Sequence, residues 1–470
     1  MQQSFLRPVL TMALIATLAT GGGGGAALAQ DKVPESQAEI SLSFAPLVKQ
    51  AAPAVVNIYA KRIVESRQSP FASDPFFSQF FRNLGPSRPQ VQNSLGSGVI
   101  LSDDGIVVSN YHVVGDADEI RIALNDRREY DAEVLLADPS VDLAILKLKD
   151  AQDLPHLELR DSDSVEVGEL VLAIGNPFGV GQTVSSGIVS GLARSGAAAG
   201  AERGYFIQTD APINPGNSGG ALVDTKGNLI GVNTSILSRS GGSNGIGFAI
   251  PAALVRQFVA QAREGKPAFE RPWAGMSGHS VDTDMAGALG LDHPEGLVID
   301  GMHAESPFAV KGFQPGDVIL EVDGLPVSSP AEMVFRMSVK GLGGDARITR
   351  LRDGKRDEVT VPMKAAPDLP ARDPVETDGR GPIPGMTLVT VNPAVIAEFG
   401  LPLATEGALV QTPGQVGQRA GLRAGDVLLE VNGKDVLTSR DADKALSDSA
   451  RSLRLDVLRE GRKVTMRFRL

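Results

Sequence analysis

The stretch INPGNSGGAL, residues 213–222, surrounds one serine with glycines, asparagines and a proline. Glycine adopts backbone angles that other residues avoid, and it lets a ligand approach the main chain. Gly216, Gly219 and Gly220 therefore predict a sharp turn whose amides could hold an anion beside the Ser218 hydroxyl. The alternative is a tight loop between two strands that has no chemical role.

A serine hydroxyl becomes a good nucleophile when a base removes its proton, and that base is usually a histidine held by a carboxylate. His112 follows the apolar run IVVS, so a strand would present it at the rim of a barrel, whereas His156 reads as an exposed loop residue. Asp142 leads directly into the run LAILKL, and we favour it over Asp138 as the carboxylate. Each residue alone could be structural, but the order His, Asp, Ser occurs in known triads.

Length, charge and cysteine content restrict the class of protein. A chain of 470 residues is expected to form about three domains. The 45 Lys and Arg and 56 Asp and Glu give a net charge of −11, which argues against a nucleic-acid partner. Cysteine is absent, which excludes disulfides, thiolate catalysis and Cys-ligated metal sites.

The N-terminus has the pattern of a signal peptide over residues 1–29. Arg7 precedes an apolar run over residues 9–18, and Ala-Leu-Ala at residues 27–29 supplies the small side chains of a cleavage site. Gln30 would then begin the mature chain. The run is too short for an ordinary membrane span, although a glycine tract before the cleavage site leaves an uncleaved anchor as the alternative. An exported chain without disulfides fits a bacterial periplasm.

Many short apolar runs broken by Gly, Asn and Asp follow Leu95 and predict a closed all-β architecture. The run GVILSDDGIVVSN predicts two strands about a turn at residues 104–105, and PAALVRQFVAQAREG predicts a helix over residues 251–265. Residues 65–94 are rich in Pro and Ser and predict a long loop. The phenylalanines of this loop would dock on a partner subunit, cover a cleft or pack on their own domain: Phe71, Phe76, Phe77, Phe80 and Phe81.

The C-terminal part contains an internal repeat. FQPGDVILEVDG at residues 313–324 matches LRAGDVLLEVNG at residues 422–433, and each copy ends in Asp-Gly or Asn-Gly, a pair that favours a turn with two positive φ angles. The Pro-rich, charged segment between the copies reads as a linker. The predicted boundaries are 1–29 for the signal peptide, 40–265 for the β domain, 270–365 and 381–470 for the repeats, and 366–380 for the linker.

Together these motifs resemble the HtrA/Deg (Do-like) serine endoproteases. The similar segments are SNYHVV, DLAILKL, AIGNPFG, TDAPINPGNSGGALVDTKGNLIGVNT and GIGFAIP, followed by the two repeats. The resemblance covers nearly everything after residue 40. It implies a mainly β fold, in which a chymotrypsin-like double β-barrel protease domain is followed by two PDZ domains.

The resemblance also implies a role for each residue of the site. Ser218 would be the nucleophile, His112 the general base and acid, and Asp142 the residue that orients His112. The backbone amides of Gly216, Asn217 and Ser218 would form an oxyanion hole.

Substrate recognition is implied in the same way. NTSIL resembles the strand that pairs with an extended substrate, although it could be an ordinary barrel strand. The specificity pocket contains no acid, which favours cleavage after small aliphatic residues, and Arg194 resembles the family's sensor arginine. The implied substrate-binding residues are Ile213, Thr234, Ser235, Ile236, Leu237, Gly247, Phe248, Ala249 and Ile250.

In the repeats, WAGM and IPGM stand where the family has its loop for a peptide carboxylate. The first motif comprises Trp273, Ala274, Gly275 and Met276, and the second spans residues 383–386. Both depart from the bulky aliphatic-Gly-aliphatic pattern, so the peptide-binding competence of the second repeat stays open.

The leading hypothesis is an ATP-independent serine endopeptidase that degrades misfolded or unfolded proteins in the periplasm and has chaperone activity. C-terminal peptides would bind the PDZ domains, and the chain would form a homotrimer or a higher homo-oligomer. No phosphate-binding loop or metal-ligand cluster suggests a cofactor. The alternative is a non-proteolytic PDZ chaperone or scaffold that binds unfolded clients.

Overall fold

The computed structural model describes residues 43–64, 90–115, 117–176, 181–195, 205–214, 216–236, 244–378, 381–449 and 452–469. The predicted signal peptide and the five loop phenylalanines lie outside these residues. Within them, no helix has the length and apolar character needed to cross a membrane.

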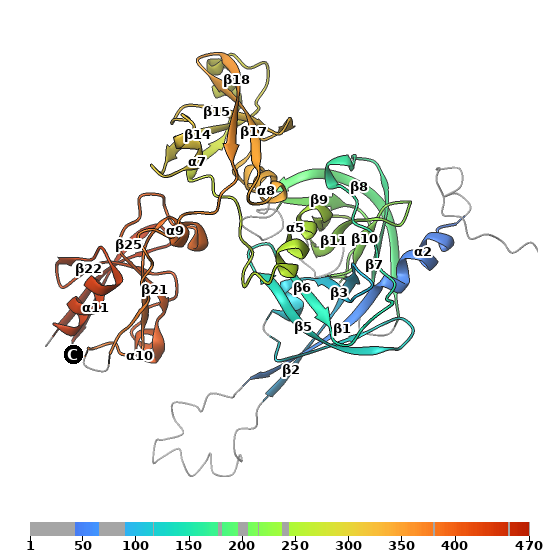
Figure 1. The fold of residues 1–470 in the computed structure, drawn as a ribbon, viewed down its shortest axis with the longest axis horizontal. Helices are drawn as coiled ribbons and strands as arrows, with labels where there is room; N and C mark the ends of the chain where they lie inside the picture. Colours follow the sequence, from blue (N-terminus) through green and yellow to red (C-terminus); the bar gives the residue numbers. More distant parts are fainter. Residues whose placement is uncertain are drawn as a thin grey trace, which may run out of the picture.

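Antiparallel strands close into a first barrel in the order β1-β2-β3-β6-β5-β4 (Figure 1). Exposed and buried residues alternate along β4, because successive side chains of a strand point to opposite faces. The predicted hairpin is confirmed, since Ile100 pairs with Val107 across a turn in which Gly105 has a φ of 92°. The strands are β1 (Val55–Val64), β2 (Gln90–Ile100), β3 (Ile106–Ser109), β4 (Glu119–Ala123), β5 (Glu129–Asp138) and β6 (Leu143–Leu148).

The prediction of a loop up to residue 94 is wrong at its end. β2 begins at Gln90, and β1 and β2 pair along their whole length from Val55 opposite Val99 to Val64 opposite Gln90. The polar composition gave no sign of this strand. Two paired strands of a long hairpin can be joined by backbone hydrogen bonds without an apolar face.

A second closed barrel has the order β10-β11-β12-β9-β8-β7. It packs against the first barrel through a shared core that includes Val108, Leu143, Phe206 and Ile250. This confirms the predicted double barrel. The strands are β7 (Leu170–Gly175), β8 (Thr183–Ser195), β9 (Tyr205–Thr209), β10 (Ala221–Val223), β11 (Leu229–Ile236) and β12 (Gly247–Pro251).

Short helices join or cover the barrels. The predicted helix is confirmed as α5 (Ala252–Arg263), which Pro251 precedes as N-cap and which buries Val255 and Phe258 in the shared core. The other helical segments here are α2 (Ala45–Ala51), η1 (Ala52–Ala54), α4 (Tyr111–Val114) and η2 (Ser162–Ser164).

The two repeats fold into separate sheets with the same succession of elements, apart from one additional strand at the start of the second (Figure 1). The predicted turns are confirmed, because Asp323 and Gly324 have φ angles of 52° and 81°, and Asn432 and Gly433 have 51° and 78°. The first repeat comprises β13 (Met276–Ser280), α6 (Thr283–Leu289), β14 (Leu297–Met302), α7 (Pro307–Val310), β15 (Val318–Val322), β16 (Leu325–Pro326), α8 (Pro330–Lys340), β17 (Asp345–Arg352) and β18 (Lys355–Pro362).

The second repeat differs by an additional strand, β19, at the edge of its sheet. It comprises β19 (Val375–Glu376), β20 (Thr387–Thr390), α9 (Pro393–Phe399), β21 (Ala408–Thr412), α10 (Gly414–Arg419), β22 (Val427–Val431), β23 (Lys434–Asp435), α11 (Ser439–Ser447), β24 (Ser452–Arg459) and β25 (Arg462–Arg469). β19 lies inside residues 366–380, so this segment is not the free spacer that its composition suggested.

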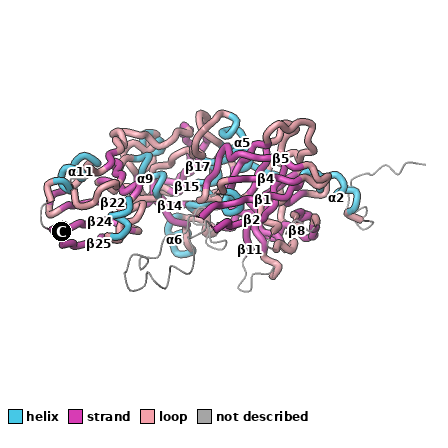
Figure 2. Tube along the Cα trace, turned by 90° about the horizontal axis from the view of Figure 1, so that it is seen from below, coloured by secondary structure: helices cyan, strands magenta, loops and turns pink. Residues whose placement is uncertain are grey.

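The first repeat docks on the second barrel through α8, and in Figure 2 it lies between the barrels and the second repeat. Phe335 of α8 stacks on Tyr205 of β9 with ring centroids 3.9 Å apart, and Gln257 of α5 donates to the Val339 carbonyl at 2.8 Å. Burial raises the pKa of Tyr205 to about 12. This contact fixes the first repeat beside the strands β8 and β9.

Candidate active site

His112 and Asp142 meet at the rim of the first barrel. His112 lies on α4, directly after β3, and Asp142 immediately precedes β6. The His112 Nδ1 lies 2.8 Å from Asp142 Oδ2, and the His112 amide donates to Asp142 Oδ1 at 2.9 Å. The carboxylate therefore holds both the ring and the backbone of the histidine and leaves Nε2 available on the other side of the ring.

The backbone around Asp142 explains how the carboxylate reaches this position. Asp142 has a φ of 58°, a left-handed conformation that costs energy for a residue with a side chain. The buried Asn110 side chain donates to the Asp142 carbonyl at 2.9 Å and stabilises that conformation. The side chain of Asp142 is only 22% exposed, whereas that of His112 is 52% exposed.

The glycine-rich stretch forms a turn, as its composition predicts. The Asn217 amide donates to the Asn214 carbonyl at 2.9 Å, and Gly216 has a φ of 100°. This combination is typical of a type II turn, which requires a positive φ at its third residue and hence favours glycine there. Gly219 also has a positive φ, and a Cβ there would lie 2.1 Å from the Ser97 carbonyl oxygen.

The proposed oxyanion hole needs a correction at Asn217. Its amide already donates to Asn214 within the turn, so it cannot donate to a substrate oxygen in this conformation. The amides of Gly216 and Ser218 have no acceptor among the described residues. These two amides are therefore the ones that remain for an anion.

Ser218 is hydrogen-bonded to Thr234 rather than to His112. Its Oγ donates to the Thr234 carbonyl at 3.0 Å, and the Thr234 hydroxyl donates to Asp142 Oδ2 at 2.6 Å. Within the described part of the chain, no hydrogen bond joins Ser218 to His112. The structure thus brings His112 and Asp142 together directly and brings Ser218 to them through Thr234.

Ser97 is a residue of the site that the sequence did not reveal. Its Oγ donates to the Gly216 carbonyl at 2.6 Å and accepts from the Asn176 amide at 2.8 Å. Its own amide donates to the Ser218 carbonyl at 2.9 Å. The only local signal is a serine between two glycines in LGSGVI, 119 positions before Gly216.

The predicted specificity residues divide into two groups. Ile213 is 1% exposed and lies against Gly247. A Cβ added to Gly247 would come within 2.7 Å of the Cδ1 atom of Ile213. Phe248 and Ile250 belong to the core between the barrels, and their assignment to the pocket stays a prediction. Ala249 is fully buried in the same cluster as Ile213.

The remaining predicted substrate and regulatory residues are described in part. Ser235 and Ile236 belong to β11, at a bulge in its pairing with β12, and Leu237 lies outside the described residues. Arg194 pairs with Phe206 in β8 and β9. The sensor role of Arg194 stays a prediction.

The WAGM loop of the first repeat is well ordered by its neighbours. Gly275 has a φ of 59°, and its carbonyl accepts from the His303 amide at 2.8 Å. Ser306 Oγ donates to the Ala274 carbonyl at 2.5 Å, and the Trp273 ring packs edge-on against His303. Met276 begins β13.

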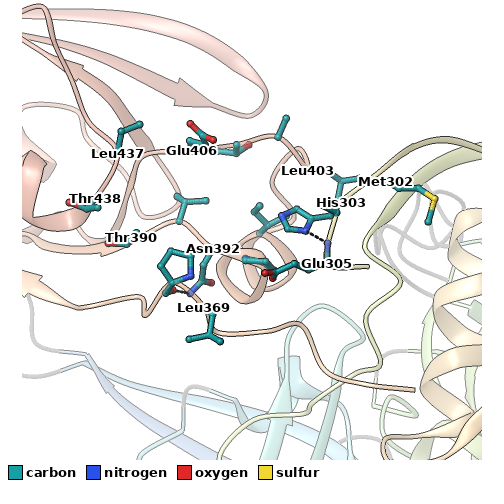
Figure 3. Close-up of a pocket in the computed structure, with 17 residues that line it drawn as sticks. Met302, His303, Glu305, Leu369, Thr390, Asn392, Leu403, Glu406, Leu437 and Thr438 are labelled. Atoms are coloured by element: carbon teal, nitrogen blue, oxygen red, sulfur yellow. Dashed lines mark hydrogen bonds between the residues drawn. The ribbon is translucent and has the colours of Figure 1, made fainter. Parts of the chain in front are cut away.

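No group of three or more His, Cys, Asp or Glu in the described ranges could hold a metal ion. An open pocket of about 650 Å³ lies between the two repeats rather than at the barrels (Figure 3). Its walls include Met302 and His303 from the first repeat and Leu403 and Leu437 from the second. None of the residues that line it belongs to either barrel, so the pocket is separate from the candidate active site.

Comparisons with known proteins agree with this geometry. The trypsin-like peptidase domain family matches residues 96–232, and PDZ domain families match residues 277–363 and 409–459. The probable periplasmic serine endoprotease DegP-like of Pseudomonas putida (strain W619) is 37% identical over 468 residues, covering 95% of this chain and 97% of that protein. The chain belongs to the DegP-like, HtrA-type serine endoproteases.

Other members of the family are similarly close. The DegP-like protein of Halomonas elongata is 38% identical and covers 83% of this chain and 84% of its own length. Among solved structures, the HtrA-type protease AlgW with a decapeptide is 40% identical, with a TM-score of 0.51 over 69% of this chain and 99% of that one. The protein is therefore a serine endopeptidase with a chymotrypsin-like domain and two PDZ domains.

Proposed function

We propose that this HtrA-type protease degrades misfolded or unfolded proteins in the periplasm without ATP. Ser218 is the nucleophile, His112 is the general base, and Asp142 orients His112. The observation that carries this assignment is the double contact of Asp142 with His112, at 2.8 Å to the ring and 2.9 Å to the amide. It orients Nε2 for proton transfer, as a catalytic triad requires.

The reaction would proceed by acyl transfer. The Ser218 Oγ gives its proton to His112 Nε2 and attacks the scissile carbonyl carbon, while the amides of Gly216 and Ser218 stabilise the negative oxygen. The protonated His112 then donates this proton to the leaving amine as the peptide bond breaks. A water molecule, deprotonated by His112, hydrolyses the acyl-enzyme and restores Ser218.

Substrate binding would switch the Ser218 hydroxyl from its present acceptor to His112. The hydroxyl now occupies the Thr234 carbonyl, which lies at a bulge of β11. An extended substrate that pairs with β11 would offer a backbone N–H to this carbonyl and compete with Ser218. Unfolded chains supply such extended segments, which supports the proposed substrate class.

The names of the relatives support the proposed partners and location. The relatives are named periplasmic, which supports export of this chain by a cleaved signal peptide. AlgW was solved with a decapeptide, which supports peptide binding by this chain, and we propose that C-terminal peptides bind at its PDZ domains. We also propose chaperone activity and a homotrimer or higher homo-oligomer, to be tested by native mass with and without unfolded casein.

Hydrolysis of unfolded casein by wild type and by Ser218→Ala tests the proposal. We expect the variant to lose about 10⁴- to 10⁶-fold in kcat, because loss of the nucleophile leaves only binding and oxyanion stabilisation. A fluorophosphonate probe should label Ser218 in the wild type and nothing in the variant. Equal, negligible cleavage by both proteins would instead favour a chaperone or scaffold that binds clients without cutting them.

A further inference from the structure

The two PDZ domains differ at the sheet edge beside the predicted carboxylate-binding loop. In the first domain, β13 follows the loop and forms the end of the sheet, and most of its residues are exposed. In the second domain, β20 follows the loop but is covered, because β19 pairs with it with Val375 opposite Leu388. Leu388, Val389 and Thr390 are all buried.

β19 also contacts the helix that flanks this edge. α11 packs against both β19 and β20, as α8 packs against β13 in the first domain. At the start of α11, Ser439 Oγ donates to the Asp373 carbonyl at 2.6 Å, and Arg440 Nη2 donates to Asp373 Oδ1 at 3.0 Å. The segment before the loop therefore lies between strand and helix, where a peptide would add to the sheet as an extra strand.

Thr377 is hydrogen-bonded to the predicted carboxylate-binding loop, residues 383–386. The Gly385 amide donates to the Thr377 carbonyl at 3.0 Å, and the Met386 amide donates to Thr377 Oγ1 at 3.0 Å. Thr377 is 5% exposed. Two oxygens of one residue thus accept from loop amides that could otherwise bind a terminal carboxylate. In the first domain, the described residues offer the Gly275 amide no such acceptor.

The same segment is fixed further upstream. The Thr390 amide donates to the Arg372 carbonyl at 2.6 Å, and the Asn392 side chain donates to the Pro370 carbonyl at 2.7 Å. The contacts extend along the whole segment, so they do not arise from a single turn next to β20.

We propose that residues 372–377 are the resident ligand of the second PDZ domain, so that C-terminal peptides bind the first PDZ domain alone unless this segment is displaced. A segment tethered to the domain has an effective concentration in the millimolar range. It therefore competes strongly with a free peptide that is present at a much lower concentration. The consequence for peptides rests on the proposed peptide binding of these domains, whereas the occupied groove does not.

Hydrogen exchange of the full-length protein tests the occupied groove without any peptide. We expect fragments covering residues 387–390 to exchange at least about tenfold slower than fragments covering residues 277–280, because both edges of β20 are paired. Thr377→Ala should accelerate exchange at 387–390 and leave 277–280 unchanged. The matched control is Thr412→Ala, which removes a hydroxyl bonded to Thr387 at 2.7 Å without touching the segment.

Photo-crosslinking tests the consequence for binding. The probe is a ten-residue peptide with three apolar C-terminal residues, a free carboxylate and a benzophenone, compared with the same peptide amidated. We expect the wild type to be labelled on β13 and α8 only. The variant Thr377→Ala/Arg440→Ala should gain label on β20 and α11, and the milder Arg440→Ala serves if the double variant unfolds.

Equal exchange of the two strands, or label on β20 in the wild type as strong as on β13, would overturn the proposal. It would also be overturned if Thr377→Ala left exchange at 387–390 unchanged. Slow exchange at 387–390 together with no peptide label anywhere would leave the occupied groove standing and contradict the proposed peptide binding.

Discussion

The two barrels contribute to the proposed active site in different ways. The first barrel provides His112 and Asp142, which are already joined by a direct contact of 2.8 Å. The second provides Ser218 on a turn, and its hydroxyl donates to Thr234 instead of His112. The acid–base pair is thus preassembled within one barrel, whereas alignment of the nucleophile depends on the junction between the two.

Asp142→Asn tests the preassembled half of the site and should have the largest effect after loss of the nucleophile itself. An amide can offer His112 Nδ1 a donor instead of an acceptor, which favours the wrong tautomer of the ring. We expect kcat on unfolded casein to fall about 10⁴-fold while substrate affinity is kept.

Asp138→Asn is the matched control, because Asp138 ends β5 just before the loop that holds Asp142, and its carboxylate accepts from Arg271 at 2.6 Å rather than from His112. It should keep activity within about threefold of wild type. Comparable losses in the two variants would mean that the orienting carboxylate has been misassigned.

Gly219→Ala tests the junction by steric conflict. Gly219 has a φ of 82°, and a Cβ would lie 2.1 Å from the Ser97 carbonyl oxygen and 2.5 Å from Ser109 Oγ. We expect the barrels to lose about 3 kcal/mol of stability, seen as a lower thermal midpoint.

Gly168→Ala separates the clash from backbone strain. Gly168 has a φ of 97°, but nothing lies within 4 Å of the position that a Cβ would take there. It should cost only about 1 kcal/mol. If both variants lowered the thermal midpoint equally, the close approach of the two barrels at Gly219 would add nothing to the loss of stability beyond backbone strain.

The sequence predicts the two halves of the site unequally. His112 and Asp142 were predictable because His112 follows β3 and Asp142 precedes β6, and the apolar pattern of each strand is local. The turn before Ser218 was predictable from its glycines. The use of the Asn217 amide inside that turn was not, since it depends on which carbonyl the turn brings opposite it.

Contacts between distant segments escaped prediction for the same reason. Thr234 reaches Asp142 over 92 positions, and Val375 lies opposite Leu388 only because β19 pairs with β20. Residues 366–380 were predicted to be a linker from their composition alone. The strand β19 within them is too short to show an alternating apolar pattern in the sequence. The double barrel and the two repeats were predictable, since their strand patterns and turns recur along the chain.

Ser97→Ala sharpens the comparison at the level of one hydroxyl. Ser97 Oγ is the first-barrel group that holds the Gly216 carbonyl, at 2.6 Å, and it positions the peptide between the two proposed oxyanion amides. We expect kcat to fall about tenfold with KM unchanged, since a positioning residue acts less than a direct donor. Reaction with a fluorophosphonate should slow by a similar factor.

The control for Ser97→Ala is Ser338→Ala in the first PDZ domain, which removes a buried hydroxyl that donates to the Val334 carbonyl at 2.7 Å. Both variants should lower stability by about 1 kcal/mol, but only Ser97→Ala should lower kcat. A rise in KM with kcat unchanged would contradict the positioning role.

The smallest expected effect concerns a charged contact of the first barrel with the helix that follows the second. Asp104 accepts from Ser102, which, with Lys147 and Arg263 nearby, lowers the pKa of this carboxyl to about 2. Because the folded pKa lies below the unfolded value, the contact stabilises the fold above about pH 4, and this stabilisation is lost as the pH falls toward 2. The side chain is 44% exposed, so solvent screening limits the contribution to about 1 kcal/mol or less. Between pH 5 and pH 3, the thermal midpoint of the wild type should therefore fall slightly more than that of Asp104→Asn. Identical pH profiles of the two proteins would show that the Asp104 charge does not stabilise the fold.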